Sequence, residues 1–112
     1  MGLQPPHRRK LMEKKMIQLV EVYNSSGHTG GGLKYNLREI FINPKHVVAI
    51  RPDDRMRKML NEGYLPEEMD KRQGFTKVYM DRGQSGIDIT VVGEAGIVSQ
   101  KLGLHQKELL KG

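Results

Sequence analysis

The side chains best suited to acid–base or metal chemistry near neutral pH are four histidines, because the chain contains no cysteine. These are His7, His28, His46 and His105. No two of them show the close spacing of paired metal ligands on one element. A long-range pairing, such as that of His28 with Asp88, stays open. We therefore expect a non-enzymatic protein without a metal or another cofactor.

Cationic side chains are the second group with recognisable chemistry. Several follow the third predicted strand, while Lys77 and Tyr79 share the outward face of a later one. Small sheets that combine basic side chains with an aromatic platform bind single-stranded nucleic acids. The predicted nucleic-acid or polyanion contacts are Arg8, Arg9, Lys10, Lys14, Lys15, Arg51, Arg55, Arg57, Lys58, Lys77, Tyr79 and Arg82.

Residues 1–15 form a basic arm that differs in composition from the rest of the chain. Five Lys or Arg stand against Glu13, so the arm carries +4 of the formal net charge of +6. Two interpretations stay open. Either the arm is a disordered tail, or even lies upstream of a true start at Met16, or it orders on a phosphate-rich or acidic partner.

A chain of 112 residues is long enough for one domain, which we place at residues 16–103 and follow with a C-terminal tail at 104–112. Because there is no Trp and there are only 2 Phe, the core must consist of Ile, Val, Leu and Met. No apolar run approaches the ~20 residues that cross a membrane. The basic arm also lacks the apolar stretch of a secretory signal. We expect a cytoplasmic protein with no membrane partner.

β-Branched runs separated by turn residues predict a mainly β fold, a small antiparallel five-stranded meander or open barrel. Apolar residues on both faces of residues 16–23 indicate a central strand. The glycine-rich loop at 24–35 leads into a strand and not into the helix of a P-loop, so its role stays open. The predicted strands are residues 16–23, 36–42, 46–51, 76–80 and 86–92.

A helical insert is predicted at residues 53–73 and a short C-terminal helix at 94–102. In the insert, Asp54 would cap a helix at 55–62, and a second helical turn would cover 67–72. Apolar side chains of the insert should pack on the sheet: Met56, Met59, Leu60 and Met69.

The order of these elements resembles a small family. Met-Ile-X-Leu at Met16 is followed by Phe41-X-Asn43-Pro44, a strand ending near Pro52, a hairpin with a glycine turn, and a helix starting at Glu94. This pattern resembles the small β-proteins of the FlbD type, which belong to bacterial flagellar operons. It is also similar to small proteins of tailed bacteriophages. The resemblance covers residues 16–52 and 76–102, while the arm, the glycine-rich loop and the insert depart from it.

The resemblance implies an accessory protein of a phage or bacterium that acts by protein–protein interaction, as a virion component or as a modulator of a host machine. Its place would be the host cytoplasm or, if phage-encoded, the virion. We expect a protein partner or a homo-oligomer through a sheet edge, because the strands at 76–80 and 87–92 lack proline and carry only Lys77 and Asp88 as charges. Nucleic-acid binding is the alternative, and sequestration of a nucleotide-like ligand is a minor one.

Overall fold

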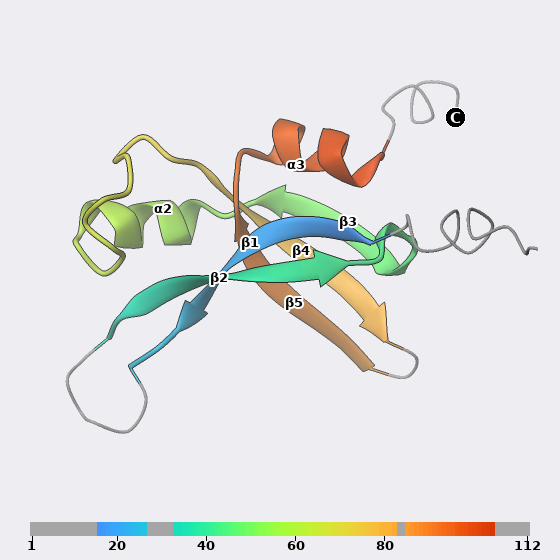
Figure 1. The fold of residues 1–112 in the computed structure, drawn as a ribbon, viewed down its shortest axis with the longest axis horizontal. Helices are drawn as coiled ribbons and strands as arrows, with labels where there is room; N and C mark the ends of the chain where they lie inside the picture. Colours follow the sequence, from blue (N-terminus) through green and yellow to red (C-terminus); the bar gives the residue numbers. More distant parts are fainter. Residues whose placement is uncertain (1–15, 27–32, 83–84, 105–112) are drawn as a thin grey trace, which may run out of the picture.

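The computed structural model describes residues 16–26, 33–82 and 85–104, and the side chains of Arg82 and Ser85 lie outside that description. Within these ranges the protein forms an antiparallel five-stranded open sheet with two α-helices, as Figure 1 shows. The predicted mainly β fold is therefore confirmed. The elements are β1 (Ile17–Asn24), β2 (Tyr35–Ile42), the 3₁₀ turn η1 (Pro44–His46), β3 (Val47–Pro52), α2 (Asp54–Asn61), β4 (Phe75–Arg82), β5 (Ser85–Val92) and α3 (Ala95–Leu102).

The sheet consists of two parts joined by a narrow seam. Its strand order is β2-β1-β5-β4-β3, with every neighbouring pair antiparallel. β1 pairs with β2 along the whole of both strands, and β4 pairs with β5 in the same way. Between β1 and β5 only Glu21↔Val91 and Val22↔Thr90 are in register. The β1–β2 hairpin therefore crosses the β4–β5 pair instead of lying flat beside it (Figure 1).

The chain passes from one edge of the sheet to the other through Asn43 and η1. The Asn43 side chain accepts a hydrogen bond from the Lys45 amide at 3.0 Å, and Pro44 begins the turn. Because a 3₁₀ turn advances only about 2 Å per residue, the end of β2 stays near the start of β3. The alternating strand directions make β2 and β3 run the same way, so they do not form the hairpin of a simple meander. The sheet is curled toward a barrel and stays open between them.

One face of the sheet forms the main core under α3. Leu19 of β1 and Val91 of β5 pack there with Val98 and Leu102 of α3, together with Ile42 and Val78. Val78 and Val91 have no measurable exposure. The helix ends at Gly103, whose φ of +74° is the left-handed conformation that glycine adopts without a steric cost. The aliphatic core expected from the composition is thus built across the seam.

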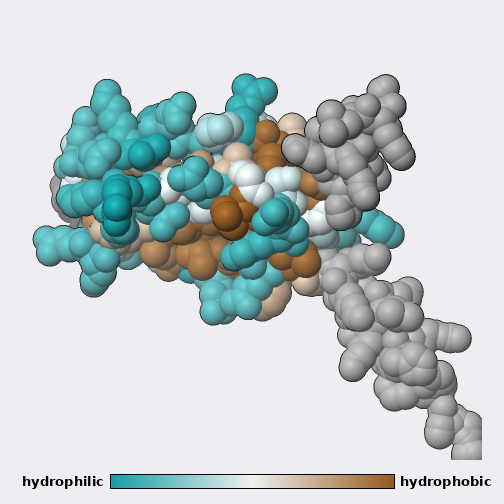
Figure 2. All heavy atoms as spheres, turned by 90° about the horizontal axis from the view of Figure 1, so that it is seen from above, coloured by the Kyte–Doolittle hydropathy of each residue, from teal (hydrophilic) through white to brown (hydrophobic). Residues whose placement is uncertain are grey.

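The opposite face carries a second, smaller core under α2. It contains Val22 of β1, Phe75 of β4, and three side chains of the insert, Met56, Leu60 and Leu65. Met59 and Met69 pack against it, so the predicted packing of the insert on the sheet is confirmed. Seen from above in Figure 2, hydrophilic side chains cover the end of the molecule that holds α2, whereas hydrophobic ones gather in the middle.

Two local predictions were wrong. The residue that caps α2 is Asp53, not Asp54, since the Asp53 carboxylate accepts from the Met56 amide at 3.0 Å. Residues 67–72 form turns and no helix, because the Asp70 side chain accepts from the Arg72 amide at 2.8 Å and competes with helical bonding. The same Asp53 carboxylate also accepts from Thr90 of β5, which is buried and donates its hydroxyl at 2.6 Å.

The bond between Thr90 and Asp53 should contribute measurably to stability. Thr90→Val keeps the shape of the side chain but leaves a buried carboxylate oxygen without its donor, at a cost of about 1–3 kcal/mol in the free energy of unfolding. Thr90→Ser, which keeps the hydroxyl, should lose less. Urea denaturation followed by circular dichroism measures both. A Thr90→Val protein more stable than Thr90→Ser would contradict this assignment.

Candidate interaction edge and cationic surface

The edges of the sheet are β2 and β3, not the strands named from the sequence. β1, β4 and β5 each have a neighbour on both sides. Their lack of proline therefore reflects a central position, because proline cannot donate to a ladder on either side. The strand at 76–80, which the sequence left open as either an edge or a central strand, is central and is fully buried at Val78.

The β3 edge is poorly suited to pairing with another strand. Its register with β4 shifts between Val47 and Ala49, so Val48 is the extra residue of a bulge. The side chain of Val48 is 68% exposed. β3 then ends at Pro52, which has no amide hydrogen. Bulges and prolines are common devices that prevent edge-to-edge association.

The β2 edge is regular and open. Just beyond the paired strands, the Ser25 amide donates to the Lys34 carbonyl at 2.9 Å, so the backbone of Lys34 faces β1. The amide of the following residue, Tyr35, points the other way and donates to the Tyr64 carbonyl at 2.9 Å. Backbone groups of an antiparallel strand alternate in direction. The amides and carbonyls of Leu37, Glu39 and Phe41 therefore point away from β1. Within the described residues, no hydrogen bond satisfies them on that side.

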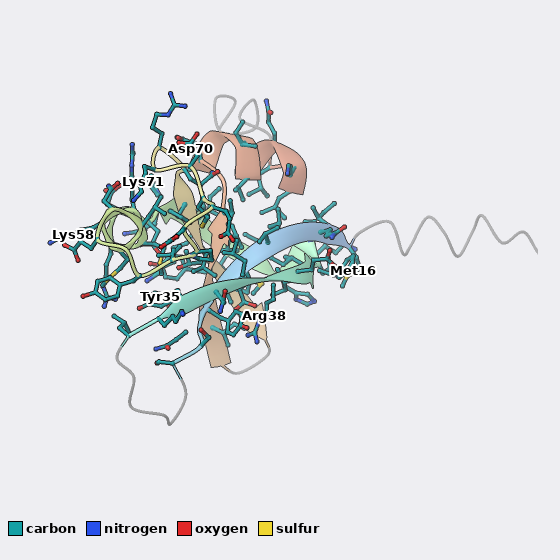
Figure 3. The ribbon with its side chains drawn as sticks, turned by 60° about the vertical axis from the view of Figure 1, so that its left-hand side comes forward. Met16, Tyr35, Arg38, Lys58, Asp70 and Lys71 are labelled. Carbon is teal, nitrogen blue, oxygen red and sulfur yellow. The ribbon has the colours of Figure 1, made fainter. Side chains whose placement is uncertain are left out.

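Exposed apolar side chains lie beside this open stretch. Phe41 is 56% exposed, and Val20, which is opposite Glu39 in the β1–β2 register, is 36% exposed. Met16, at the start of β1 in Figure 3, is 48% exposed. We call Met16, Val20 and Phe41 the β2 shelf. α2 does not cover it, because the residues of β2 that pack in the second core, Tyr35 and Leu37, are at the other end of the strand.

The charged side chains of β2 differ in their surroundings. Arg38 donates from Nε to Glu21 Oε1 at 3.0 Å, and its guanidinium lies 4.2 Å from the centre of the Tyr23 ring. The hydrogen bond with Glu21 raises the pKa of Arg38 above its ordinary value. Figure 3 shows Arg38 on β2, and its partners Glu21 and Tyr23 belong to the neighbouring strand β1. Glu39, by contrast, forms no ion pair with any described residue. Glu39 is therefore the charge that the open edge presents to a partner.

The structure brings together three of the predicted polyanion contacts. Arg51 of β3 and Lys77 of β4 are directly opposite each other, and the Arg51 guanidinium lies 5.6 Å from the centre of the Tyr79 ring. Neither cation is paired with a described carboxylate. Like charges placed opposite each other repel, so an anion bound between them would be favoured. We call Arg51, Lys77 and Tyr79 the cationic triad.

The other predicted contacts do not join the triad as one surface. Arg55, Arg57 and Lys58 are exposed on α2, and Figure 3 shows Lys58 projecting away from the sheet. Arg57 lines a separate cavity of about 160 Å³ with Gly74 and Glu94. The five cations of the basic arm, Arg8, Arg9, Lys10, Lys14 and Lys15, and the side chain of Arg82 lie outside the described residues.

A shallow recess adjoins the triad at Tyr79. Its volume is about 350 Å³, and its wall includes Val48 and Ile87, the latter 39% exposed. No local sequence signal predicts this recess, because its wall combines residues of β3 with residues of the β4–β5 hairpin. Two carboxylates, Asp81 and Asp88, are also part of the wall.

The described ranges also contain histidines, carboxylates and helices outside these two surfaces. No group of three or more His, Asp or Glu there is arranged to hold a metal ion. His46 is exposed on η1, and His7, His28 and His105 lie outside the described residues. No described helix is long and apolar enough to cross a membrane. Comparison of the chain with protein-family models, with curated proteins and with solved structures finds no match.

The alternation along β2 makes neighbouring residues respond differently to proline. The Glu39 amide points to the open side, so Glu39→Pro should unfold at nearly the same urea concentration as Glu39→Ala. The Arg38 amide bonds to β1, so Arg38→Pro should be less stable than Arg38→Ala by about 1–3 kcal/mol. Equal losses at the two positions would show that the outward assignment of Glu39 is wrong.

Proposed function

We propose that this protein is a non-enzymatic accessory protein of a phage or bacterium, and that it binds another protein chain along the open edge of β2. The observation that carries the proposal is the row of outward backbone groups at Leu37, Glu39 and Phe41, for which the described part of the chain provides no partner. An extended chain that adds to a sheet edge satisfies such groups, and side chains beside the edge provide selectivity. The accessory role, as a virion component or as a modulator of a host machine, rests on the resemblance to FlbD-type and phage proteins and stays a prediction.

The β2 shelf supports the same edge. An added strand would lie next to Phe41 and bring its own side chains over apolar surface that the described residues leave exposed. Burial of apolar area stabilises association by about 25 cal/mol per Å² before the costs of binding are subtracted. The bulged β3 edge offers neither a regular row of free groups nor a proline-free end. β2 is thus the favoured edge of the two.

The proposal predicts assembly that depends on one amide. The full-length protein should run above its monomer mass in size-exclusion chromatography with light scattering at high micromolar concentration, and the amides of Leu37, Glu39 and Phe41 should exchange slowly with solvent. Glu39→Pro should lower the mass to that of the monomer, because it removes the central donor of the edge. Val48→Pro, at the β3 bulge, is the matched control and should leave the assembly intact.

A monomeric protein whose β2 amides exchange freely would remove the homo-oligomer. If the protein is monomeric but those three amides are already protected, the edge is covered from within the same chain. If Glu39→Pro and Val48→Pro weaken the assembly equally, β2 is not the surface through which it forms.

Nucleic-acid binding is a second candidate function, favoured by the cationic triad. Arg51 and Lys77 could each contact a phosphate while a base stacks near Tyr79, next to the apolar wall of the recess. Sequestration of a nucleotide-like ligand would use the same three side chains. A mononucleotide competitor in a binding assay distinguishes these two ligands.

The triad gives a prediction that depends on salt. For single-stranded DNA, each phosphate contact contributes about 0.7 to the slope of log affinity against log salt concentration, so the Arg51→Ala/Lys77→Ala protein should show a slope smaller by ~1.4. Lys58→Ala, which removes an outward cation of α2, should change the slope less. Fluorescence anisotropy with a labelled oligonucleotide at several salt concentrations measures this slope. An unchanged slope in the double variant would mean that the triad does not contact phosphate.

A further inference from the structure

The charge at the centre of the open edge disfavours pairing of β2 with a second β2. Symmetric antiparallel pairing that uses all three outward residues places each Leu37 opposite a Phe41 and the two copies of Glu39 opposite each other. Side chains directly opposite in a ladder are about 5 Å apart, and like charges there are destabilising. A shift of the register toward Tyr35 meets an amide that already donates to Tyr64. A shift the other way leaves Leu37 unpaired.

The edge therefore fits a strand that places a cation opposite Glu39 and apolar side chains two positions away on either side. The last residues of the basic arm, together with Met16, contain this pattern. Met12, Lys14 and Met16 alternate with Glu13 and Lys15, so in an extended strand the first three share one side. The arm also carries a net charge of +4.

The position and length of the arm allow it to reach such an edge. It directly precedes β1, whose first residue, Ile17, is opposite Ile42 next to the shelf residue Phe41. Figure 1 shows the start of β1 and the end of β2 at the same end of the molecule, beside η1. Fifteen extended residues span up to ~50 Å, whereas an eight-residue strand such as β2 spans about 27 Å. To reach its own β2 edge, the arm would have to cross the path that the chain takes through η1.

We propose that the basic arm of one copy adds as a strand to the β2 edge of a second copy, with an arm lysine opposite Glu39. This inference rests on the proposed function, and it names the occupant of the edge. It also assigns a role to the arm.

A charge exchange in the full-length protein tests the proposal. Glu39→Lys alone and Lys14→Glu/Lys15→Glu alone should each raise the dissociation constant of the assembly at least tenfold, because each sets like charges against each other. The triple variant that combines these changes should restore much of the affinity. Glu62→Lys, the same charge change on the exposed end of α2, is the control and should have little effect. Sedimentation velocity measures the masses.

The outcomes separate this inference from the proposed function. If the protein assembles with protected β2 amides and both charge reversals leave the dissociation constant unchanged, the arm is not the strand that binds. The β2 edge would then bind a different strand. A monomeric protein with protected β2 amides overturns the claim that the arm binds a second copy, since the edge is then covered from within the same chain. A monomer with freely exchanging amides overturns the inference and removes the homo-oligomer from the proposed function. Restored assembly in the triple variant supports the pairing of the arm with Glu39.

Discussion

The seam between β1 and β5 is the contact on which the rest of this structure depends. Only two register pairs join the β1–β2 hairpin to the other three strands. Backbone hydrogen bonds contribute about 1 kcal/mol each, less than the 1.5–3 kcal/mol gained when a large aliphatic side chain is buried. The seam is therefore held mainly by side chains on its two faces, Leu19 and Val91 on one and Val22 on the other. Each helix covers one of these faces, which explains why so small a sheet has two cores.

The same arrangement explains why one edge is left open. Residues that the hairpin needs for packing lie on β1 and on the inner face of β2, where Ile42 is 2% exposed. Among the described residues, no element covers the outer side of β2 beyond Leu37, since the chain continues through η1 to β3. The insert packs against the first half of β2, at Tyr35 and Leu37, and hydrogen-bonds to it where the Tyr35 amide donates to the carbonyl of Tyr64. The bulge protects the β3 edge, and the insert occupies the amide of Tyr35, the first residue of β2. The stretch from Leu37 to Phe41 is therefore the accessible one.

Much of the fold follows from local pattern, whereas the sites depend on contacts between distant segments. The β-branched runs predicted the strands, and apolar residues on both faces of residues 16–23 correctly indicated a central one. Nothing local predicts that β1 pairs with β5, about 70 residues later in the chain. The identity of the edges follows from that pairing, so the lack of proline in the strands at 76–80 and 87–92 could not show whether they are edges, and both are central. Lys77 and Tyr79 were expected on one face and are, but the approach of Arg51 to Tyr79 required the β3–β4 register.

The route of the chain through Asn43 and η1 also has a mechanical consequence. β2 and β3 run in the same direction and are joined by four residues, so a pull along β2 is passed through the covalent chain to β3. The load then falls on two ladders, β2 against β1 and β3 against β4, and acts parallel to the strands. In that geometry the bonds of a ladder must break together and not one after another. A chain attached along β2 and pulled lengthwise would thus meet its greatest resistance, whereas a sideways pull would open the short seam first.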